Sequence, residues 1–211
     1  SPRAEQVPAM QRRRLSPVGQ ACCKLLFALD PDADLPIIHA SRHGDTGKIL
    51  ALLDAATQSD EALSPARFSL SVHNAVLGMY SITGKSHQPL EALAACGNEF
   101  EALMSEALGY LSERGDVIVL FSDIAAPEAF LLHGDYPACA SAVALRLSRS
   151  SDDDSAWTLS ATPGESLTDS APTPLEVIAW LEQAGAETLP CRRHHWQLSR
   201  AHAASPTPPA D

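Results

Sequence analysis

Short apolar runs alternate along the chain with stretches in which apolar side chains recur every three or four residues. Unbroken apolar runs are typical of strands covered on both faces of a sheet, and recurrence at three and four residues predicts helices. Helices are expected at 18–29, 45–56, 68–82, 99–111 and 174–183, and strands at 35–40, 117–121, 140–147 and 195–199. Their alternation predicts an α/β layered domain.

The helix expected at 18–29 carries signals at both ends. Ser16 suits the N-cap because its hydroxyl can accept a backbone N–H, and Pro17 suits the first helical position, where its missing N–H is not needed. Asp30 and Pro31 are typical of a helix stop. We therefore expect the chain to leave this helix at Asp30 and to enter the strand at 35–40.

The segment 68–82 combines apolar and small residues at helical spacing. Its larger residues on one face are Val72, Val76, Met79 and Tyr80, and its small residues are Ala75, Gly78 and Ser81. Small side chains let another backbone approach closely, so we expect one buried helix. His73 and Asn74 within it would need hydrogen-bond partners, either as a satisfied core pair or in a ligand pocket or subunit interface.

The remaining segments predict one domain followed by a tail. Residues 1–200 are expected to form the domain, and residues 201–211, rich in Pro and Ala, a disordered tail. The acidic run at 152–154 is expected to be a solvated loop, and the stretch 157–161 to pair with the preceding strand as a hairpin. The basic run at 12–14 is either a solvated turn or a site for a phosphate or an acidic partner.

The charge of the chain argues against several classes of partner. The 211 residues include 26 acidic and 15 basic ones, which gives a formal net charge of −11. This argues against non-specific nucleic-acid binding and against anionic membrane surfaces. No stretch approaches the roughly 20 apolar residues that span a bilayer, and no secretory signal is evident. We therefore expect a cytoplasmic protein.

Cysteine and histidine usage argues against metals and cofactors. The five cysteines, with Cys22 and Cys23 adjacent, do not suit a disulfide framework, and no CxxC spacing is present. The eight histidines form no HExxH pair. The loop at 41–45 follows an expected strand, a usual position for a binding loop, but it lacks the glycine patterns of nucleotide sites. We expect neither a metal nor a cofactor.

Cys96 is the candidate nucleophile. With Gly97 it stands between a possible strand end and an expected helix start, where the helix dipole favours a thiolate. A cysteine nucleophile also needs a base or an oxyanion donor, and His73, His87 and His133 stand at no diagnostic spacing from it. The alternative is a small buried thiol with a packing role.

Three segments together resemble the beta-ketoacyl synthase-like N-terminal domain family. They are PAMQRRRLS at 8–16, ASRHG at 40–44 and LSPARFSLSVHNA at 63–75, followed by Gly78, Ser81 and Ile82. The resemblance covers most of residues 8–125, and WQLSR at 196–200 also fits it. Members look like the first half of a ketosynthase and occur with the synthesis of aryl polyene and xanthomonadin-type pigments. The resemblance implies a thiolase-like half-fold with a mixed sheet and flanking helices.

The resemblance also implies roles for particular residues. The segment matching 64–78 lies along the dimer interface of ketosynthases and shapes the partner's acyl tunnel, which places Phe68, Val72, His73, Asn74 and Gly78 at an interface or tunnel. The loop carrying Arg42 and His43 matches a stretch beside that tunnel.

The catalytic cysteine of ketosynthases begins the helix that corresponds to 97–111. Counting from Asn74 places it at Gly97, and a one-residue gap brings Cys96 into register. The resemblance implies that ketosynthases take two catalytic His groups, or a His and a Lys, from a C-terminal half that this sequence lacks, so independent condensation is not expected.

The leading hypothesis is therefore a non-catalytic ketosynthase-like subunit, akin to a chain length factor. It would pair with a full-length ketosynthase as a heterodimer through the region 68–82 and limit the acyl or polyene tunnel. Acyl carrier protein would be a partner of the complex through the basic run at 12–14. The alternative is an acyltransferase or thioesterase-like enzyme with Cys96 as nucleophile and His73 or His133 as base. A third possibility is a free-standing binder of a hydrophobic small molecule.

Overall fold

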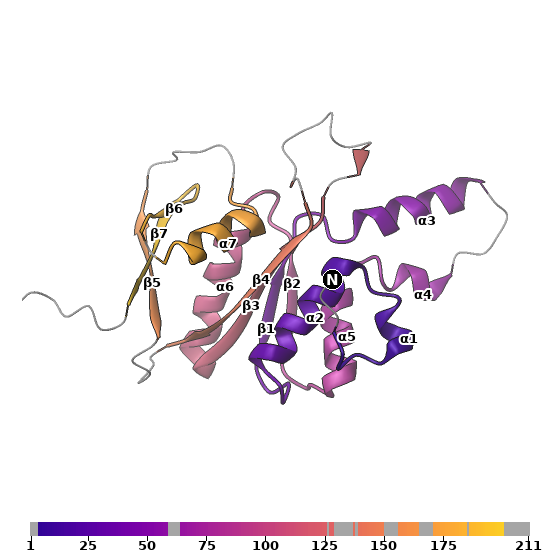
Figure 1. Cartoon of the computed structure of the whole chain (residues 1–211), viewed down its shortest axis with the longest axis horizontal. Helices are drawn as coiled ribbons and strands as arrows, with labels where there is room; N and C mark the ends of the chain where they lie inside the picture. The colour runs from indigo at the N-terminus through magenta and orange to yellow at the C-terminus, as the bar shows by residue number, and fades with distance from the viewer. Residues whose placement is uncertain are drawn as a thin grey trace, which may run out of the picture.

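A four-stranded mixed sheet forms the centre of the computed structural model, which describes residues 4–58, 64–125, 127–128, 137, 139–149, 156–164, 171–184 and 186–200. Its strand order is β2-β1-β3-β4 (Figure 1). β1 (Ile37–Ala40) is parallel to both β2 (Leu90–Leu93) and β3 (Asp116–Asp123). β4 (Ser141–Ser148) is antiparallel to β3. The mixed sheet confirms the layered α/β class.

Helices cover both faces of this sheet, as Figure 1 shows. α2 (Pro17–Leu29) and α5 (Ala75–Gly84) lie on one face, and α6 (Glu99–Arg114) and α7 (Pro174–Glu182) on the other. Adjacent strand residues alternate between the two cores, because successive side chains in a strand point to opposite faces. Ile37 thus packs with α2 and α5, and Ile38 packs with α6 and α7.

The ends of α2 follow the sequence signals. Gly19 donates its backbone N–H to the Ser16 hydroxyl at 3.3 Å, and Pro17 occupies the first turn. After the helix, the Asp30 carboxylate accepts a hydrogen bond from the Tyr80 hydroxyl at 2.9 Å. Because Tyr80 lies in α5, this contact ties α2 and α5 together on one face of the sheet. The predicted start and stop of α2 are confirmed.

The expectation of one buried helix over 68–82 is wrong in two ways. The segment forms α4 (Pro65–Phe68), a turn, and then α5. The turn is favoured locally because the hydroxyls of Ser69 and Ser71 donate to carbonyls three residues earlier, an alternative to a regular helix. α5 is also buried only on the side of Leu77, Met79 and Tyr80, since Gly78 is exposed and nothing lies within 4 Å of the position of a Cβ there.

The expected hairpin of residues 157–161 with the preceding strand is also wrong. β5 (Trp157–Pro163) pairs with β7 (His194–Arg200) in a second, three-stranded sheet of order β5-β7-β6, where β6 is Leu189–Pro190. β2 is the possible strand that the sequence indicates before Cys96. The helix expected at 99–111 continues to Arg114. The acidic run at 152–154 and the tail at 201–211 lie outside the described residues.

Three further helices lie at the end of the molecule away from β5, β6 and β7 (Figure 1). They are α1 (Ala9–Arg12), α3 (Thr46–Gln58) and α4. No helix in the described part of the chain is long and apolar enough to cross a bilayer.

Candidate functional site

The carboxyl ends of the three parallel strands gather polar side chains at one edge of the sheet. The loop at 41–45 leaves β1, the segment that contains Cys96 leaves β2, and Asp123 ends β3. We call this edge the carboxyl-edge site, defined by His39, His43, His73, Ser122 and Asp123. Crevices at such strand ends are the usual binding positions of α/β sheets. The expected placement of both loops between a strand and a helix is confirmed.

His39 is a buried, neutral member of this site. Its Nε2 lies 2.8 Å from the Ser122 hydroxyl, and the residue is 4% exposed. Burial lowers the pKa of His39 to about 4, and the neighbouring imidazole of His73 contributes to the decrease. A neutral imidazole in a hydrogen bond is the state that burial favours.

Asp123 titrates in the opposite direction. Burial raises the pKa of Asp123 to about 6, although the backbone amides of Ile124 and His43 donate to its Oδ1 at 3.2 and 3.3 Å. The pKa of His43 is lowered, first by burial and then by the positive charge of Arg42. The site therefore holds a carboxyl group and two imidazoles whose charged forms are all disfavoured by burial.

His73 packs against the loop at 41–45 at the position of a glycine. Gly44 adopts φ +57, and a Cβ there would stand 3.2 Å from the His73 ring. The Gly44 N–H donates to the Ser41 hydroxyl at 2.9 Å. Only a residue without a side chain suits both the left-handed backbone and the close approach.

The cavity beside these residues is small. It measures about 30 Å³ and is lined among others by His39, Ser41, His73, Ser122 and Asp123. A space of this size holds about two water molecules. The cavity at the carboxyl edge therefore has no room for an acyl chain, whereas larger hollows of about 330 and 280 Å³ lie beside Gln20 and beside Trp180.

Cys96 lies in the connection from β2 to α6 and is exposed. Its backbone is left-handed at φ +50, and Gly97 follows at φ +93. The expected position between a strand end and a helix start is confirmed, whereas the packing alternative of a buried thiol is wrong.

Glu99, in the first turn of α6, folds back over this connection. Its Oε1 accepts the N–H of Gly97 at 2.8 Å and that of Ala95 at 3.3 Å, and the residue is only 4% exposed. Acidic residues in a first helical turn interact favourably with the helix dipole. Here the carboxylate takes two of the amides that precede the helix.

Two guanidinium groups flank the same connection. A Cβ at Gly97 would stand 3.6 Å from Nη2 of Arg42 and 3.8 Å from Nη2 of Arg192. Arg192 is held near by Glu101, whose Oε1 accepts from the Arg193 amide at 3.1 Å and lies 3.1 Å from His194 Nδ1. The second sheet thus supplies a cation to a loop of the first.

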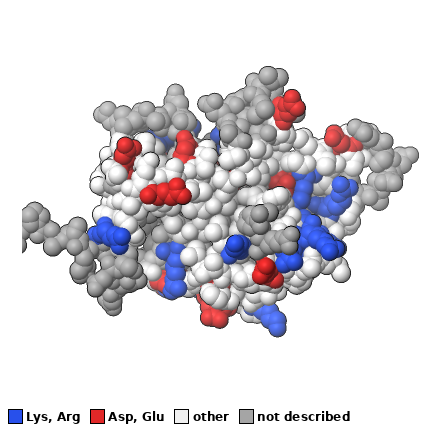
Figure 2. All heavy atoms as spheres, viewed as in Figure 1, with Lys and Arg blue, Asp and Glu red and all other residues white. Residues whose placement is uncertain are grey.

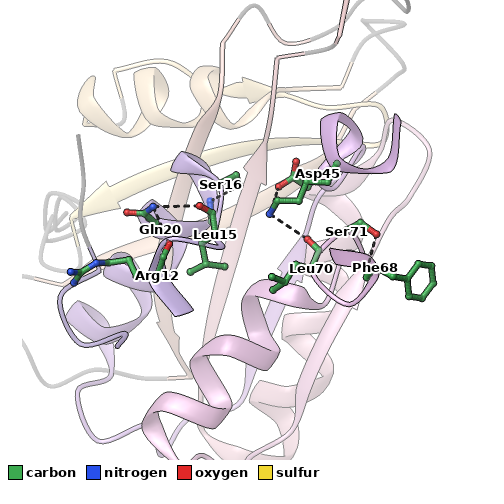
Figure 3. A network of polar contacts seen from close by, with 10 residues as sticks. Arg12, Leu15, Ser16, Gln20, Asp45, Phe68, Leu70 and Ser71 are labelled. Atoms are coloured by element: carbon green, nitrogen blue, oxygen red, sulfur yellow. Dashed lines mark hydrogen bonds and ion pairs between the residues drawn. The ribbon is translucent and has the colours of Figure 1, made fainter. Parts of the chain in front are cut away.

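The interface residues expected from the sequence lie on exposed surface around α4 and α5. Phe68 is 61% exposed and Ile82 is 70% exposed, while Val72, Asn74 and Gly78 are exposed too. Figure 3 shows the Phe68 ring directed away from Leu70 and Ser71. The Lys48 ammonium lies 2.9 Å from the Asp45 carboxylate and donates to the Leu70 carbonyl at 3.5 Å. These contacts hold the segment between α4 and α5 against α3.

The expected site residues therefore fall into two groups. Arg42, His43 and His73 come together at the carboxyl edge, and the others except Cys96 lie on the exposed α4–α5 surface. The sequence analysis did not identify six further polar residues near the site, which lie within or next to other elements: His39, Glu99, Glu101, Ser122, Asp123 and Arg192. The signal for Glu99 and Glu101 was present, because both are acidic residues at the start of an expected helix.

Basic side chains gather on one part of an otherwise acidic molecule. Figure 2 shows Lys and Arg over α1 and α4. Arg13, Arg14 and Arg67 there are exposed, and we call these three residues the basic surface. Arg12 is partly buried and donates to the Ala4 carbonyl at 3.2 Å. A positive surface on a chain of net charge −11 is suited to an acidic partner.

Comparison with known proteins identifies the family of the chain. Residues 1–199 match the family model described as beta-ketoacyl synthase, N-terminal domain. Among solved structures, the chain resembles one of a ketosynthase (ApeO) in complex with its chain length factor (ApeC) from Xenorhabdus doucetiae. The TM-score is 0.76 at 25% identity, over 94% of this chain and 83% of that one.

A second similar structure is the ishigamide ketosynthase/chain length factor. The TM-score is 0.55 at 14% identity, over 85% of this chain and 57% of that one. The two likenesses confirm the expected thiolase-like layered fold. No curated protein matches the sequence.

Proposed function

Because the chain belongs to the beta-ketoacyl synthase N-terminal domain family, we propose that it is a non-catalytic ketosynthase-like subunit, akin to a chain length factor. It pairs with a full-length ketosynthase as a heterodimer and shapes the acyl or polyene tunnel of aryl polyene synthesis, a process of the fatty-acid and polyketide type. The observation that carries this proposal is the likeness to a ketosynthase–chain length factor pair. That match spans 94% of this chain and 83% of the matched one, so the two chains are similar in length.

The exposed α4–α5 surface supports pairing. Phe68 and Ile82 present apolar area to solvent, and Gly78 offers an open backbone between them in sequence. These exposed apolar side chains are available to a partner, and a glycine on a helix lets a partner's backbone come close. A partner's helix laid along α5 would cover Gly78 and Ile82, which share one face of that helix.

The small cavity at the carboxyl edge supports a tunnel shared between two chains. About 30 Å³ beside His39 and Asp123 has room for water but not for an acyl chain. We therefore expect a polyene chain to lie between this chain and its partner, against the exposed surface, rather than at this edge of the sheet.

The basic surface supports acyl carrier protein as a further partner of the complex. Carrier proteins of this role are expected to present acidic groups. Arg13 and Arg14, which directly follow α1, and Arg67 in α4 are exposed. Opposite charges on two surfaces accelerate encounter and set orientation more than they add affinity.

Gly78→Leu tests pairing with a matched control. We expect co-expression with full-length ketosynthases of the source organism to yield a heterodimer in size-exclusion chromatography, and Gly78→Leu to abolish it. Gly109→Leu makes the same change in α6, where nothing lies within 4 Å of the Cβ position either, and should leave pairing intact.

The free Gly78→Leu chain separates a lost interface from a lost fold. Leucine has a higher helix propensity than glycine. We therefore expect the free energy of unfolding of the variant alone to be higher than that of the wild type by about 0.5 kcal/mol or more. A heterodimer that forms equally well with Gly78→Leu would contradict the proposed surface.

The alternative, an acyltransferase or thioesterase-like enzyme, is favoured by the exposure of Cys96 beside two guanidinium groups. Of the two bases expected for it, His73 lies against Gly44, and His133 lies outside the described residues. Labelling of Cys96 by an acyl-carrier mimic, with loss of product in Cys96→Ala, would favour the enzyme; Cys96→Ala with normal pigment would favour the non-catalytic subunit.

A further inference from the structure

Two arginine side chains from distant parts of the chain meet over Gly97. Arg42 lies in the loop after β1, and Arg192 lies between β6 and β7 of the second sheet. A Cβ at Gly97 would stand 3.6 Å from Nη2 of Arg42 and 3.8 Å from Nη2 of Arg192. Since both distances end at the same point, the two Nη2 atoms are at most 7.4 Å apart, the sum of the two distances. Two positive charges are therefore held close together.

The pair presents its positive charge to solvent. Two guanidinium groups repel each other unless an anion lies between them. Both arginines are exposed, and among the described residues no carboxylate forms an ion pair with Arg42. Glu99 is the nearby acid, but its Oε1 accepts the Gly97 and Ala95 amides at 2.8 and 3.3 Å and the residue is only 4% exposed. An anion from solution can reach the pair.

We infer that Arg42 and Arg192 form a binding site for one phosphate group. A single guanidinium already matches both oxygens of a carboxylate, whereas the tetrahedral oxygens of phosphate can accept N–H groups from two sides. With hydrogen bonds of about 2.8 Å on each side, a phosphate spans roughly 8 Å from nitrogen to nitrogen, so it can bridge two Nη2 atoms at most 7.4 Å apart. The site goes beyond the proposed pairing function and does not depend on it.

Titration with inorganic phosphate tests the site on the chain alone. The NMR signal of the Gly97 amide reports binding, because Gly97 lies beside both guanidinium groups, and sodium chloride keeps the ionic strength constant. We expect saturation with a Kd on the order of 1 mM, within reach of a ligand of this size. Acetate should bind at least about tenfold more weakly, since it suits one guanidinium only. A signal that does not respond to phosphate, or equal affinities for the two anions, would overturn the assignment.

Neutral variants of the two arginines test which groups bind the anion. We expect Arg42→Gln and Arg192→Gln each to weaken phosphate binding about tenfold or more, because each removes one charge-assisted donor. Arg114→Gln is the matched control, since it makes the same change at an exposed arginine in the last turn of α6, and should leave the Kd nearly unchanged. Thermal unfolding reports whether each variant keeps its fold. If Arg192→Gln does not fold, Arg42→Gln decides, and binding equal to that of the wild type would contradict the site.

Glu99→Gln supplies a change in the opposite direction. The amide oxygen of glutamine can still accept the Gly97 and Ala95 amides, but the negative charge near the anion is removed. We expect phosphate to bind about threefold more tightly or better, an increase that a merely structural role of the two arginines would not produce. Weaker binding by a folded Glu99→Gln chain would count against a phosphate beside Gly97.

Phenyl phosphate distinguishes a free ion from an esterified phosphate. Because both arginines are exposed, an ester can bind with its substituted oxygen directed toward solvent. Phenyl phosphate that binds at least as tightly as inorganic phosphate would assign the site to the phosphate group of a larger molecule. Binding of inorganic phosphate alone would assign it to the free ion. Failure of both to bind would overturn the site and leave pairing with a ketosynthase untouched, since Gly78→Leu tests it separately.

Discussion

Two buried residues of the carboxyl-edge site respond to acid in opposite ways. The pKa of His39 is lowered to about 4 and that of Asp123 is raised to about 6, in both cases first by burial. For His39, the native state binds fewer protons than the unfolded chain, so the stabilisation is fully present above about pH 6.5 and is lost as pH falls toward 4. For Asp123 the native state binds more protons, so the stabilisation is present below about pH 4 and is lost as pH rises through 6.

Asp123→Asn should uncover the histidine contribution. Between about pH 4.5 and 7.5 each group changes the free energy of unfolding by about 2 kcal/mol, in opposite directions, so the two nearly offset in the wild type. The asparagine oxygen can still accept the His43 and Ile124 amides but does not titrate. We expect the stability of the variant, measured by urea unfolding, to fall by about 2 kcal/mol more than that of the wild type on acidification. Parallel curves for the two proteins would show that Asp123 is not held protonated by burial.

The residues of this site differ in how visible they are in the sequence. Cys96 and His73 can be selected because cysteine and histidine have few uses. Arg42 and His43 follow a strand and come with a family resemblance. Asp123 ends an apolar strand and gives no signal until its burial and its neighbours are known, since the same residue at an open strand end would be an ordinary surface acid.

At the scale of elements, α5 carries two glycines with opposite requirements. Gly78 faces open space. At Gly84 a Cβ would stand 2.6 Å from the Ala33 Cβ and 3.3 Å from the Phe27 ring. The first glycine therefore has no role that the fold of this chain explains, whereas the second allows α5 to pack against α2 and the turn after it.

Alanine at each position should separate the two roles. We expect Gly78→Ala to stabilise the free chain by about 0.5–1 kcal/mol, because alanine is the better helix former. Gly84→Ala should destabilise it by about 1–3 kcal/mol. The new methyl group would clash with the Ala33 Cβ, which is attached directly to the backbone and has no other rotamer to adopt. Denaturant unfolding of both variants measures this directly, and equal shifts of the same sign would contradict the packing described for α5.

The predictability of the elements follows the range of the interactions that define them. α2 is predictable because Ser16 and Pro17 act within one turn of the helix they begin. The break between α4 and α5 is harder to predict. Ser69 and Ser71 can lie within a helix or can turn the chain by donating to earlier carbonyls, as they do here. The spacing of the apolar residues is helical in either case, so it does not distinguish a continuous helix from a break.

The whole molecule extends this contrast. Alternation of helices and apolar strands is sufficient to predict the layers, because each strand of the central sheet must be covered on both faces. It is not sufficient to assign strand partners. β5 pairs with β7, more than thirty residues later in the sequence, rather than with its predecessor, and that pairing brings Arg192 near Gly97. Contacts between the two sheets thus define part of the Cys96 surroundings and are invisible to local pattern.

The charge distribution of the molecule leads to a prediction about the carrier protein. Arg13→Glu with Arg14→Glu reverses two charges of the basic surface on a molecule whose remaining charge is already negative. We expect the double variant to weaken binding of acyl carrier protein to the heterodimer about tenfold or more, chiefly through a slower association rate, because like charges then face each other. Surface plasmon resonance at low and high salt measures both effects, and the difference from the wild type should shrink as salt screens it.

A matched double variant separates the position of the charges from their number. Arg114→Glu with Arg149→Glu changes the net charge by the same amount. These two exposed residues flank the turn at Gly115, where the Arg149 amide donates to the Gly115 carbonyl at 3.1 Å. If carrier protein docks on α1 and α4, this control should slow association only slightly, through the long-range field. An equal loss in both double variants would mean that net charge alone guides the carrier protein, and the basic surface would then not be its docking site.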